Sequence, residues 1–225
     1  MRENVTVIFK SFERQKMAKR LYENLQKYYP GVRVVIADDS RKPLDLQGDS
    51  LTIIQLPFNS GLSYGLNQAL ERVDTPYVMR MDDDELLTVR TRLGKQVEFL
   101  ERYSEIDIVG FCVLTAIRCQ NPDEAVSEFT RFSMKDAPKP LLIPHMTRVD
   151  GNHFVMGKVP NVYVARTDKI RSIGWDSNKG AASSFCLSVR RVRSFSAAFA
   201  FCFFLESIRK SCNHHCAGNS SVSLS

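Results

Sequence analysis

The sequence predicts an α/β domain with a mostly parallel sheet and helices on both faces. Short runs rich in valine and isoleucine alternate with segments whose apolar residues recur at helical spacing. This alternation is typical of parallel sheets, in which helices form the crossovers between strands. Polar clusters follow three of the expected strands, and ligands of parallel sheets bind at the carboxyl ends of the strands. The two observations together predict a ligand site at one sheet edge.

The first part of the chain predicts four strands and two helices. The strands are expected at 5–9, 32–37, 51–56 and 77–81. The first helix is expected within 10–29 and ends at Pro30-Gly31, which is a stop signal. The apolar residues that predict the two helices are Met17, Leu21, Leu25 and Tyr28 in the first, and Leu62, Leu66, Ala69, Leu70 and Val73 in the second.

Shorter elements are expected after residue 84. Leu93, Val97 and Leu100 predict a helix, and 106–114 predicts a strand. The polar segment 121–144 contains one expected strand near 129–132, and another strand is expected at 159–165. Thr167 is expected to cap a short helix that carries Ile170 and Ile173 and ends at Gly174.

Composition separates a body at 4–176 from a tail at 177–225. The chain has 225 residues, of which 44% are hydrophobic, and a net charge of +6. The tail holds six basic residues and one acidic residue, so the body is close to neutral and lacks the basic stripe of a nucleic-acid-binding protein. Two cysteines in the body are too few for a disulfide framework. We expect one domain with no nucleic acid partner.

The tail has no clean period, and it is rich in serine, phenylalanine and cysteine. Because the local preferences of the tail conflict with an ordered domain, we predict that the tail is disordered. We also predict that it does not derive from the ancestral coding sequence, through altered splicing or a gene-model error. Cys212 and Cys216 flank two histidines, but a single cluster of this kind favours chance over zinc. The basic group 190–193 is similarly expected to be solvated, although it could touch an anionic surface. No targeting segment or membrane span is expected, since the longest apolar run is far shorter than about 20 residues.

Asp82, Asp83 and Asp84 follow the apolar run 76–81 directly. Three neighbouring carboxylates repel one another unless a positive group neutralises them. A hard divalent cation such as Mg²⁺ or Mn²⁺ is the usual partner, and it often shares its ligands with a substrate phosphate. The alternative is an acidic turn on a solvated loop.

An ordered set of motifs resembles the nucleotide-sugar glycosyltransferases of the GT-A fold. The motifs are Asp38-Asp39-Ser40 after the second strand, the run 59–69 with Asn59, Gly61, Gly65 and Asn67, the acidic triplet, and Ile173-Gly174-Trp175-Asp176. Within the family-two-like transferases the chain is most similar to the animal β-1,4-N-acetylgalactosaminyltransferases of the ganglioside-synthase kind. The resemblance covers 4–176, so it implies a GT-A domain that is incomplete at its C-terminal end.

The resemblance implies a uridine diphosphate (UDP)-sugar site. The residues expected at the donor are Lys10, Asp38, Asp39, Gly61, Asn67, Asp82 and Asp83. Asp38 or Asp39 would accept the uracil N3–H, with a turn cap as the alternative. Asn67 would hold the loop that carries the metal ligands, with a merely packed amide as the alternative. Lys10 would be a cation near the nucleotide or a solvated surface lysine.

Asp82 and Asp84 match the D-x-D pattern, which implies a site for Mn²⁺ or Mg²⁺. The cation would neutralise the charge that develops on the departing UDP. His145 or His153 could add a ligand, although a loop histidine with an ordinary polar partner is the alternative. Gly65 would permit close approach of the second helix, or it would be a plain packing glycine.

The resemblance breaks after Asp176. An inverting transferase needs a general base near the acceptor hydroxyl, and the acidic stretch that related sequences carry after this turn is absent here. Asp176 is the substitute nearest in sequence. Leu66 also stands where the family pattern often has an arginine.

The expected parent activity is inverting transfer of a hexosamine, N-acetylgalactosamine by resemblance, to a hydroxyl of a glycan or glycolipid. Related enzymes are anchored in the Golgi. Because the base is not evident, we predict impaired transfer. A non-catalytic module that binds a nucleotide sugar is the alternative. A nucleotidyltransferase is disfavoured because 10–14 contains no glycine for a phosphate loop.

Overall fold

The structure is a computed structural model that describes residues 2–111, 114–116, 127–129, 147–151, 153–155, 160–177 and 198–202. The strands are β1 (Val5–Ser11), β2 (Arg33–Asp38), β3 (Leu51–Gln55), β4 (Tyr77–Arg80), β5 (Ile106–Gly110), β6 (Leu114–Ala116), β7 (Ser127–Phe129), β8 (Arg148–Asp150), β9 (His153–Val155), β10 (Tyr163–Arg166) and β11 (Ala198–Cys202). The helices are α1 (Gln15–Tyr28), α2 (Leu62–Glu71), α3 (Leu93–Arg102) and α4 (Thr167–Ile173), after a 3₁₀ turn at Arg2–Asn4.

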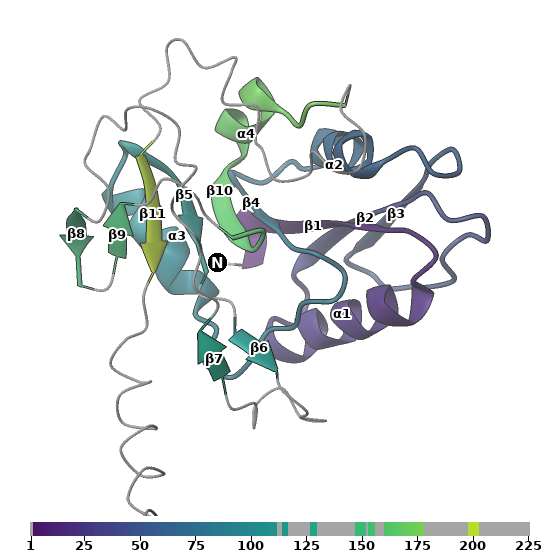
Figure 1. Ribbon diagram of the computed structural model, residues 1–225, viewed down its shortest axis with the longest axis horizontal. Helices are drawn as coiled ribbons and strands as arrows, with labels where there is room; N and C mark the ends of the chain where they lie inside the picture. Colours follow the sequence, from purple (N-terminus) through teal and green to yellow (C-terminus); the bar gives the residue numbers. More distant parts are fainter. Residues whose placement is uncertain are drawn as a thin grey trace, which may run out of the picture.

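Within the described residues, nine strands form one sheet in the order β3-β2-β1-β4-β10-β5-β11-β9-β8 (Figure 1). β3, β2, β1 and β4 are mutually parallel, and β11 is parallel to β5. β10 is antiparallel to both β4 and β5, and β9 is antiparallel to β8 and β11. β6 and β7 pair separately. The predicted α/β class is confirmed, with a parallel half that carries the first four strands.

Helices cover both faces of the sheet because the strands are apolar on both sides. Alternate residues of β1 point to opposite faces: Val5, Val7 and Phe9 join one buried cluster and Ile8 joins the other. α1 and α3 pack on the first cluster, and α2 and α4 pack on the second (Figure 1).

Strand register brings the three polar clusters to one edge of the sheet. Ser11 is opposite Asp38, and Ile8 is opposite Arg80 in the parallel pairs that β1 makes. The residues that follow β1, β2 and β4 therefore leave the sheet at the same edge. This confirms the predicted convergence of those segments.

Several predicted elements have different limits. The strand expected at 106–114 ends at Gly110, and Leu114–Ala116 forms the separate strand β6. The strand expected at 159–165 is Tyr163–Arg166, and the strand expected near 129–132 is Ser127–Phe129. Among the described residues, no helix is both long and apolar enough for a membrane span.

The predicted cap at Thr167 is wrong. Arg166 is the residue that precedes the helix, and the Thr167 hydroxyl is buried without a hydrogen-bond partner. The backbone N–H of Thr167 instead donates to the Pro76 carbonyl, which ties the start of α4 to the start of β4. Gly174 does end the helix as predicted, with a positive φ of 64° that favours glycine.

Ala198–Cys202, which belongs to the predicted tail, forms β11 between β5 and β9, and the disorder of the tail stays a prediction. The cysteine and histidine group at 212–216 and the basic group at 190–193 lie outside the described residues.

Candidate nucleotide-sugar site

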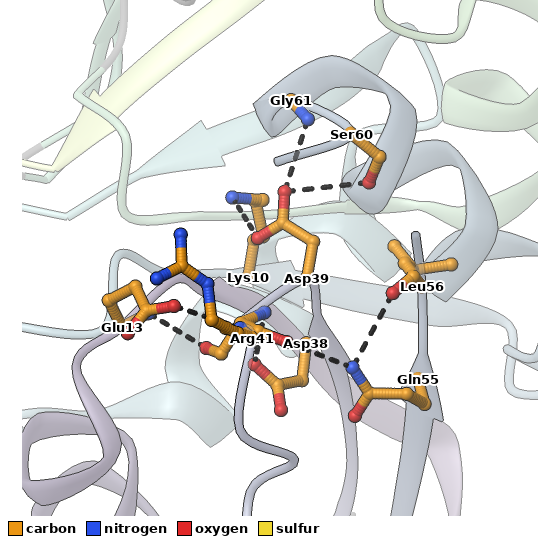
Figure 2. A network of polar contacts seen from close by, with 10 residues as sticks. Lys10, Glu13, Asp38, Asp39, Arg41, Gln55, Leu56, Ser60 and Gly61 are labelled. Atoms are coloured by element: carbon orange, nitrogen blue, oxygen red, sulfur yellow. Dashed lines mark hydrogen bonds and ion pairs between the residues drawn. The ribbon is translucent and has the colours of Figure 1, made fainter. Parts of the chain in front are cut away.

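Asp39 lies fully buried directly after β2, and it ties three elements together (Figure 2). Its Oδ1 atom is 2.6 Å from Nζ of Lys10, which extends from β1. Its Oδ2 atom accepts the backbone N–H of Gly61 at 3.1 Å and the hydroxyl of Ser60 at 3.4 Å. Gly61 precedes α2 with a φ of 94°, a conformation that glycine adopts without strain. Three predicted donor residues, Lys10, Asp39 and Gly61, thus meet at one point.

Asp38 has the turn-capping role that was the alternative to a base contact. Its two carboxylate oxygens accept the backbone N–H groups of Ser40 at 3.1 Å and Leu44 at 2.7 Å. The side chain is buried among its own loop, as expected for an aspartate that shapes a turn. The prediction that Asp38 contacts the nucleotide is therefore not supported by its geometry, and Asp39 is left as the candidate.

The loop after β1 is locked to the loop after β2 (Figure 2). The backbone N–H of Glu13 donates to the Ser40 hydroxyl at 2.7 Å, and the Glu13 carboxylate accepts the Arg41 N–H at 2.8 Å. Glu13 holds a positive φ of 56°, which costs on the order of 1 kcal/mol in a residue other than glycine. The reciprocal bonds offset this strain and hold the edge of the site in shape.

Gly65 permits the close packing of α2 on Lys10. A Cβ at this position would lie 3.1 Å from Cγ and 3.2 Å from Cδ of Lys10. Both separations are tighter than ordinary van der Waals contact. The packing role that was open for Gly65 is thus observed, and it holds the aliphatic part of Lys10 beneath the helix.

The carboxylate of Asp82 forms an ion pair with the buried Arg80. Arg80 is 2% exposed, and its Nη2 atom is 2.5 Å from Oδ1 of Asp82. Asn161 donates to Oδ2 of Asp82 at 2.9 Å, and the Asn161 carbonyl accepts from Nη1 of Arg80 at 2.7 Å. The side chains of Arg80 and Asp82 close a ring of charge-assisted hydrogen bonds with the side-chain amide and the backbone carbonyl of Asn161. Sequence reasoning did not include Arg80 or Asn161 in the site.

Asp83 and Asp84 share Arg14 as a cationic partner. Arg14 lies 3.1 Å from Asp83 and 3.0 Å from Asp84, and its hydrogen bond to Asp84 raises its own pKa. The side chain of Asp83 is buried, whereas that of Asp84 is 52% exposed. Asp84 is therefore the member of the triplet that is most accessible to a ligand. Arg14 was also missed, because nothing in its sequence neighbourhood brings it near residue 83.

Glu85 closes the turn that carries the triplet. Its N–H donates to the Asp82 carbonyl at 3.2 Å, and its carboxylate accepts the Asp82 N–H at 3.0 Å. Burial raises the pKa of Glu85 from 4.5 to about 7, and the charge of Asp82 acts in the same direction. Burial likewise raises the pKa of Asp83 from 3.8 to about 6, against the attraction of Arg14.

These raised pKa values predict that the free energy of unfolding falls as pH rises. The folded chain binds more protons than the unfolded chain between pH 4.5 and about 7 for Glu85, so ionisation in this window favours the unfolded state. With divalent cations chelated, we expect Glu85→Gln to remove on the order of 2 kcal/mol of this decline, since one pKa unit is worth about 1.4 kcal/mol and partial exposure lowers the total. Urea denaturation at several pH values measures it. Parallel profiles for the two chains would contradict the assignment to Glu85.

Asn67 does not hold the acidic loop, so that prediction is wrong. Its side-chain amide binds the backbone of Trp175 on both sides, accepting from the N–H at 2.9 Å and donating to the carbonyl at 2.8 Å. The acidic loop is instead held by Arg80, Asn161 and Arg14. Asp176 follows Trp175 directly, so Asn67 is connected to the residue that the sequence offers as a substitute base.

His153 is not placed as a metal ligand. Its ring stacks on Phe99 with centroids 3.8 Å apart, and its two nitrogens lie 3.3 Å from Asp150 and Gln96. Burial lowers its pKa, which favours the neutral ring. His153 is therefore a histidine with ordinary polar partners, which was the alternative to a metal ligand. His145 lies outside the described residues.

The described residues show whether the side chains at this edge could hold the predicted Mn²⁺ or Mg²⁺. Among them, no three His, Cys, Asp or Glu side chains gather as a set that could hold a metal ion. The donor chemistry still fits a hard cation, because Asp82 and Asp84 offer carboxylate oxygens and Asp84 is accessible. A cation here would need further oxygen ligands from a diphosphate or water, which is how Mg²⁺ is commonly bound.

The fold and this polar edge define a glycosyltransferase domain of the GT-A type. The crystal structure of residues 1–349 of S. aureus TarS is similar, with a TM-score of 0.62 and 19% identity over 88% of this chain and 57% of that chain. Its complex with UDP superposes with a TM-score of 0.59 at 15% identity, over 88% and 57% of the two chains. At these identities the likeness establishes the fold.

The chain belongs to glycosyl transferase family 2, whose family model matches residues 6–155. The β-1,4 N-acetylgalactosaminyltransferase 2 of Mus musculus is 31% identical over 184 residues, which is 78% of this chain and 34% of the relative. The β-1,4 N-acetylgalactosaminyltransferase 1 of Homo sapiens is 33% identical over 181 residues, which is 76% of this chain and 33% of the relative. The chain thus spans about a third of the length of these relatives.

Proposed function

We propose that residues 4–176 bind a UDP-linked hexosamine as the donor part of an inverting glycosyltransferase. The observation that carries the proposal is the meeting of the Lys10–Asp39–Gly61 contacts with the Asp82–Asp84 turn at one sheet edge. The relatives named as β-1,4 N-acetylgalactosaminyltransferases support N-acetylgalactosamine as the sugar. The TarS complexes with UDP and UDP-GlcNAc support a uridine donor.

Asp39 and Lys10 divide the recognition of the nucleotide. Because Asp39 is buried against Lys10, a base contact requires Lys10 to turn away from the carboxylate. Lys10 then contributes its charge to the diphosphate, and Asp39 Oδ1 accepts the uracil N3–H. A misfit base would leave this buried acceptor unpaired, which is the physical basis of discrimination between bases.

Asp84 is the carboxylate that would hold Mn²⁺ or Mg²⁺ in this site, and Asp82, fixed by Arg80, would face the ribose and the cation from the other side. When bound, the cation supplies Lewis-acid neutralisation of the diphosphate. Asp83 remains bound to Arg14 and supports the turn.

Transfer is proposed to be slow in this chain. Asp176 is the carboxylate nearest in sequence to the place where related sequences carry the base, and no acidic residue follows it before Glu206. This observation favours a second candidate, a module that binds the nucleotide sugar without transferring it. The acceptor of the parent activity would be a hydroxyl of a glycan or glycolipid, and the compartment of the parent protein would be the Golgi.

Calorimetric titration with UDP tests this function. We expect UDP to bind at least tenfold more tightly with Mn²⁺ than without it, and Asp84→Ala to remove the enhancement while the chain stays folded, since the variant deletes the accessible carboxylate. Folded wild-type chain that shows no cation-assisted binding would contradict the proposal. Release of UDP in the presence of acceptor then separates the two candidates: slow transfer supports the enzyme, and binding without transfer supports the module.

A further inference from the structure

The side-chain amide of Asn67 forms hydrogen bonds with both the backbone N–H and the backbone carbonyl of Trp175. It accepts the Trp175 N–H at 2.9 Å and donates to the Trp175 carbonyl at 2.8 Å, across 108 residues of sequence. A third, longer contact reaches the Ser177 hydroxyl at 3.2 Å. Because both polar groups of Trp175 are held by one planar amide, the direction of the chain into Asp176 is restricted.

The surroundings of this pair are rigid. The Trp175 ring is buried in the apolar cluster that includes Leu66 and Ile170, so α2, α4 and the turn share one core. Gly174 approaches so closely that an added Cβ would lie 3.3 Å from the Asn67 Oδ1 atom. A second tie is independent of Asn67: Arg171 donates to the carbonyls of Leu70 and Val73 at the C-terminal end of α2.

The same helix carries two contacts of the proposed donor site. Gly61, which precedes α2, donates to Asp39, and Gly65 packs on the stem of Lys10. Asn67 lies about half a turn beyond Gly65. α2 therefore connects the Lys10–Asp39 pair to the Trp175–Asp176 peptide through a single short helix.

We propose that Asn67 is a positioning residue, which sets the place of Asp176 relative to the Lys10–Asp39 pair through the backbone of Trp175. This inference rests on the proposed function, in which Asp176 serves the acceptor hydroxyl. Two hydrogen bonds from the Asn67 side chain fix the Trp175 backbone more firmly than packing alone. The rate of transfer depends steeply on the placement of a catalytic group such as the Asp176 carboxylate.

The test uses the tryptophan itself, since Trp175 is the chain's single tryptophan. Asn67→Ala removes both bonds, whereas Asn67→Asp keeps an acceptor for the Trp175 N–H and loses the donor. We expect acrylamide quenching of Trp175 to rise at least twofold in Asn67→Ala and by less in Asn67→Asp. We expect kcat of the residual transfer to fall about tenfold or more in Asn67→Ala, with the affinity for UDP and the KM for the donor unchanged within twofold.

Arg171→Met is the matched control, because it loosens the docking of α4 but leaves the Asn67–Trp175 pair intact. It should lower thermal stability without the same loss of kcat. The inference is overturned if Asn67→Ala leaves quenching unchanged, if Arg171→Met lowers kcat as much, or if wild-type chain binds UDP but transfers no sugar. Failure of UDP binding in the wild-type chain would instead overturn the proposed function, while the quenching results would still report on the Asn67 pair.

Discussion

Asp82→Ala is expected to lower the free energy of unfolding by about 3–5 kcal/mol, because it leaves the charge of a buried arginine without its carboxylate. Arg80 is 2% exposed and has Asp82 as its carboxylate partner at 2.5 Å. The Asn161 amide loses its acceptor in the same variant. Urea denaturation with divalent cations chelated measures the loss.

Asp84→Ala is the matched control within the same triplet. Both members of its pair are largely exposed, Arg14 at 45% and Asp84 at 52%, and exposed ion pairs contribute about 0–1 kcal/mol. Equal losses for the two variants would contradict the division of the triplet into a structural Asp82 and an accessible Asp84. A large loss at Asp82 also means that reduced activity in Asp82→Ala cannot by itself be assigned to metal binding.

Asp39→Asn is expected to lower the free energy of unfolding by about 3 kcal/mol and the affinity for UDP by at least tenfold. The amide retains an oxygen for the Gly61 N–H but leaves the Lys10 ammonium, in a nearly buried position, without a counter-charge. A neutral amide also replaces the carboxylate that is proposed to accept the uracil N3–H, so binding falls for a separate reason.

A double-mutant cycle with Lys10→Met separates the two effects. Replacing both members of a buried ion pair by neutral groups restores much of the stability that either single change removes. We therefore expect the double variant to be more stable than Asp39→Asn alone, but to bind UDP more weakly than Lys10→Met alone, which keeps the Asp39 carboxylate. A double variant that binds UDP as well as Lys10→Met does would show that Asp39 acts only as the partner of Lys10.

The secondary structure of the first half was predictable because each element carries a local signal. The short apolar run at 5–9 and the helical spacing in 62–73 depend only on near neighbours in the sequence, and β1 and α2 appear where expected. The resemblance of ordered motifs added the family, which the match to residues 6–155 confirms. The limits of β5 and β10 were less predictable, because strand ends depend on neighbouring strands.

The site was only partly predictable for the same reason. The sequence around Asp38 and Asp39 does not distinguish their roles. Their hydrogen-bond partners in the structure do, because Asp38 caps its own turn and Asp39 pairs with Lys10. Arg80 did carry a signal, since a charged residue in a buried strand requires a partner. Arg14 carried none, as its contact with Asp84 spans 70 residues.

The sequence by itself determined the class of the sheet, the order of its first elements and the convergence of its polar segments, because the hydrophobic period is a local property of the chain and helical crossovers between strands make those strands parallel. The tertiary structure alone decided which side chains face one another across that edge: Lys10 with Asp39, Arg80 with Asp82, and Asn67 with Trp175. These pairs join residues on different elements. Their partners follow from how the elements pack, and spacing along the chain does not encode that packing.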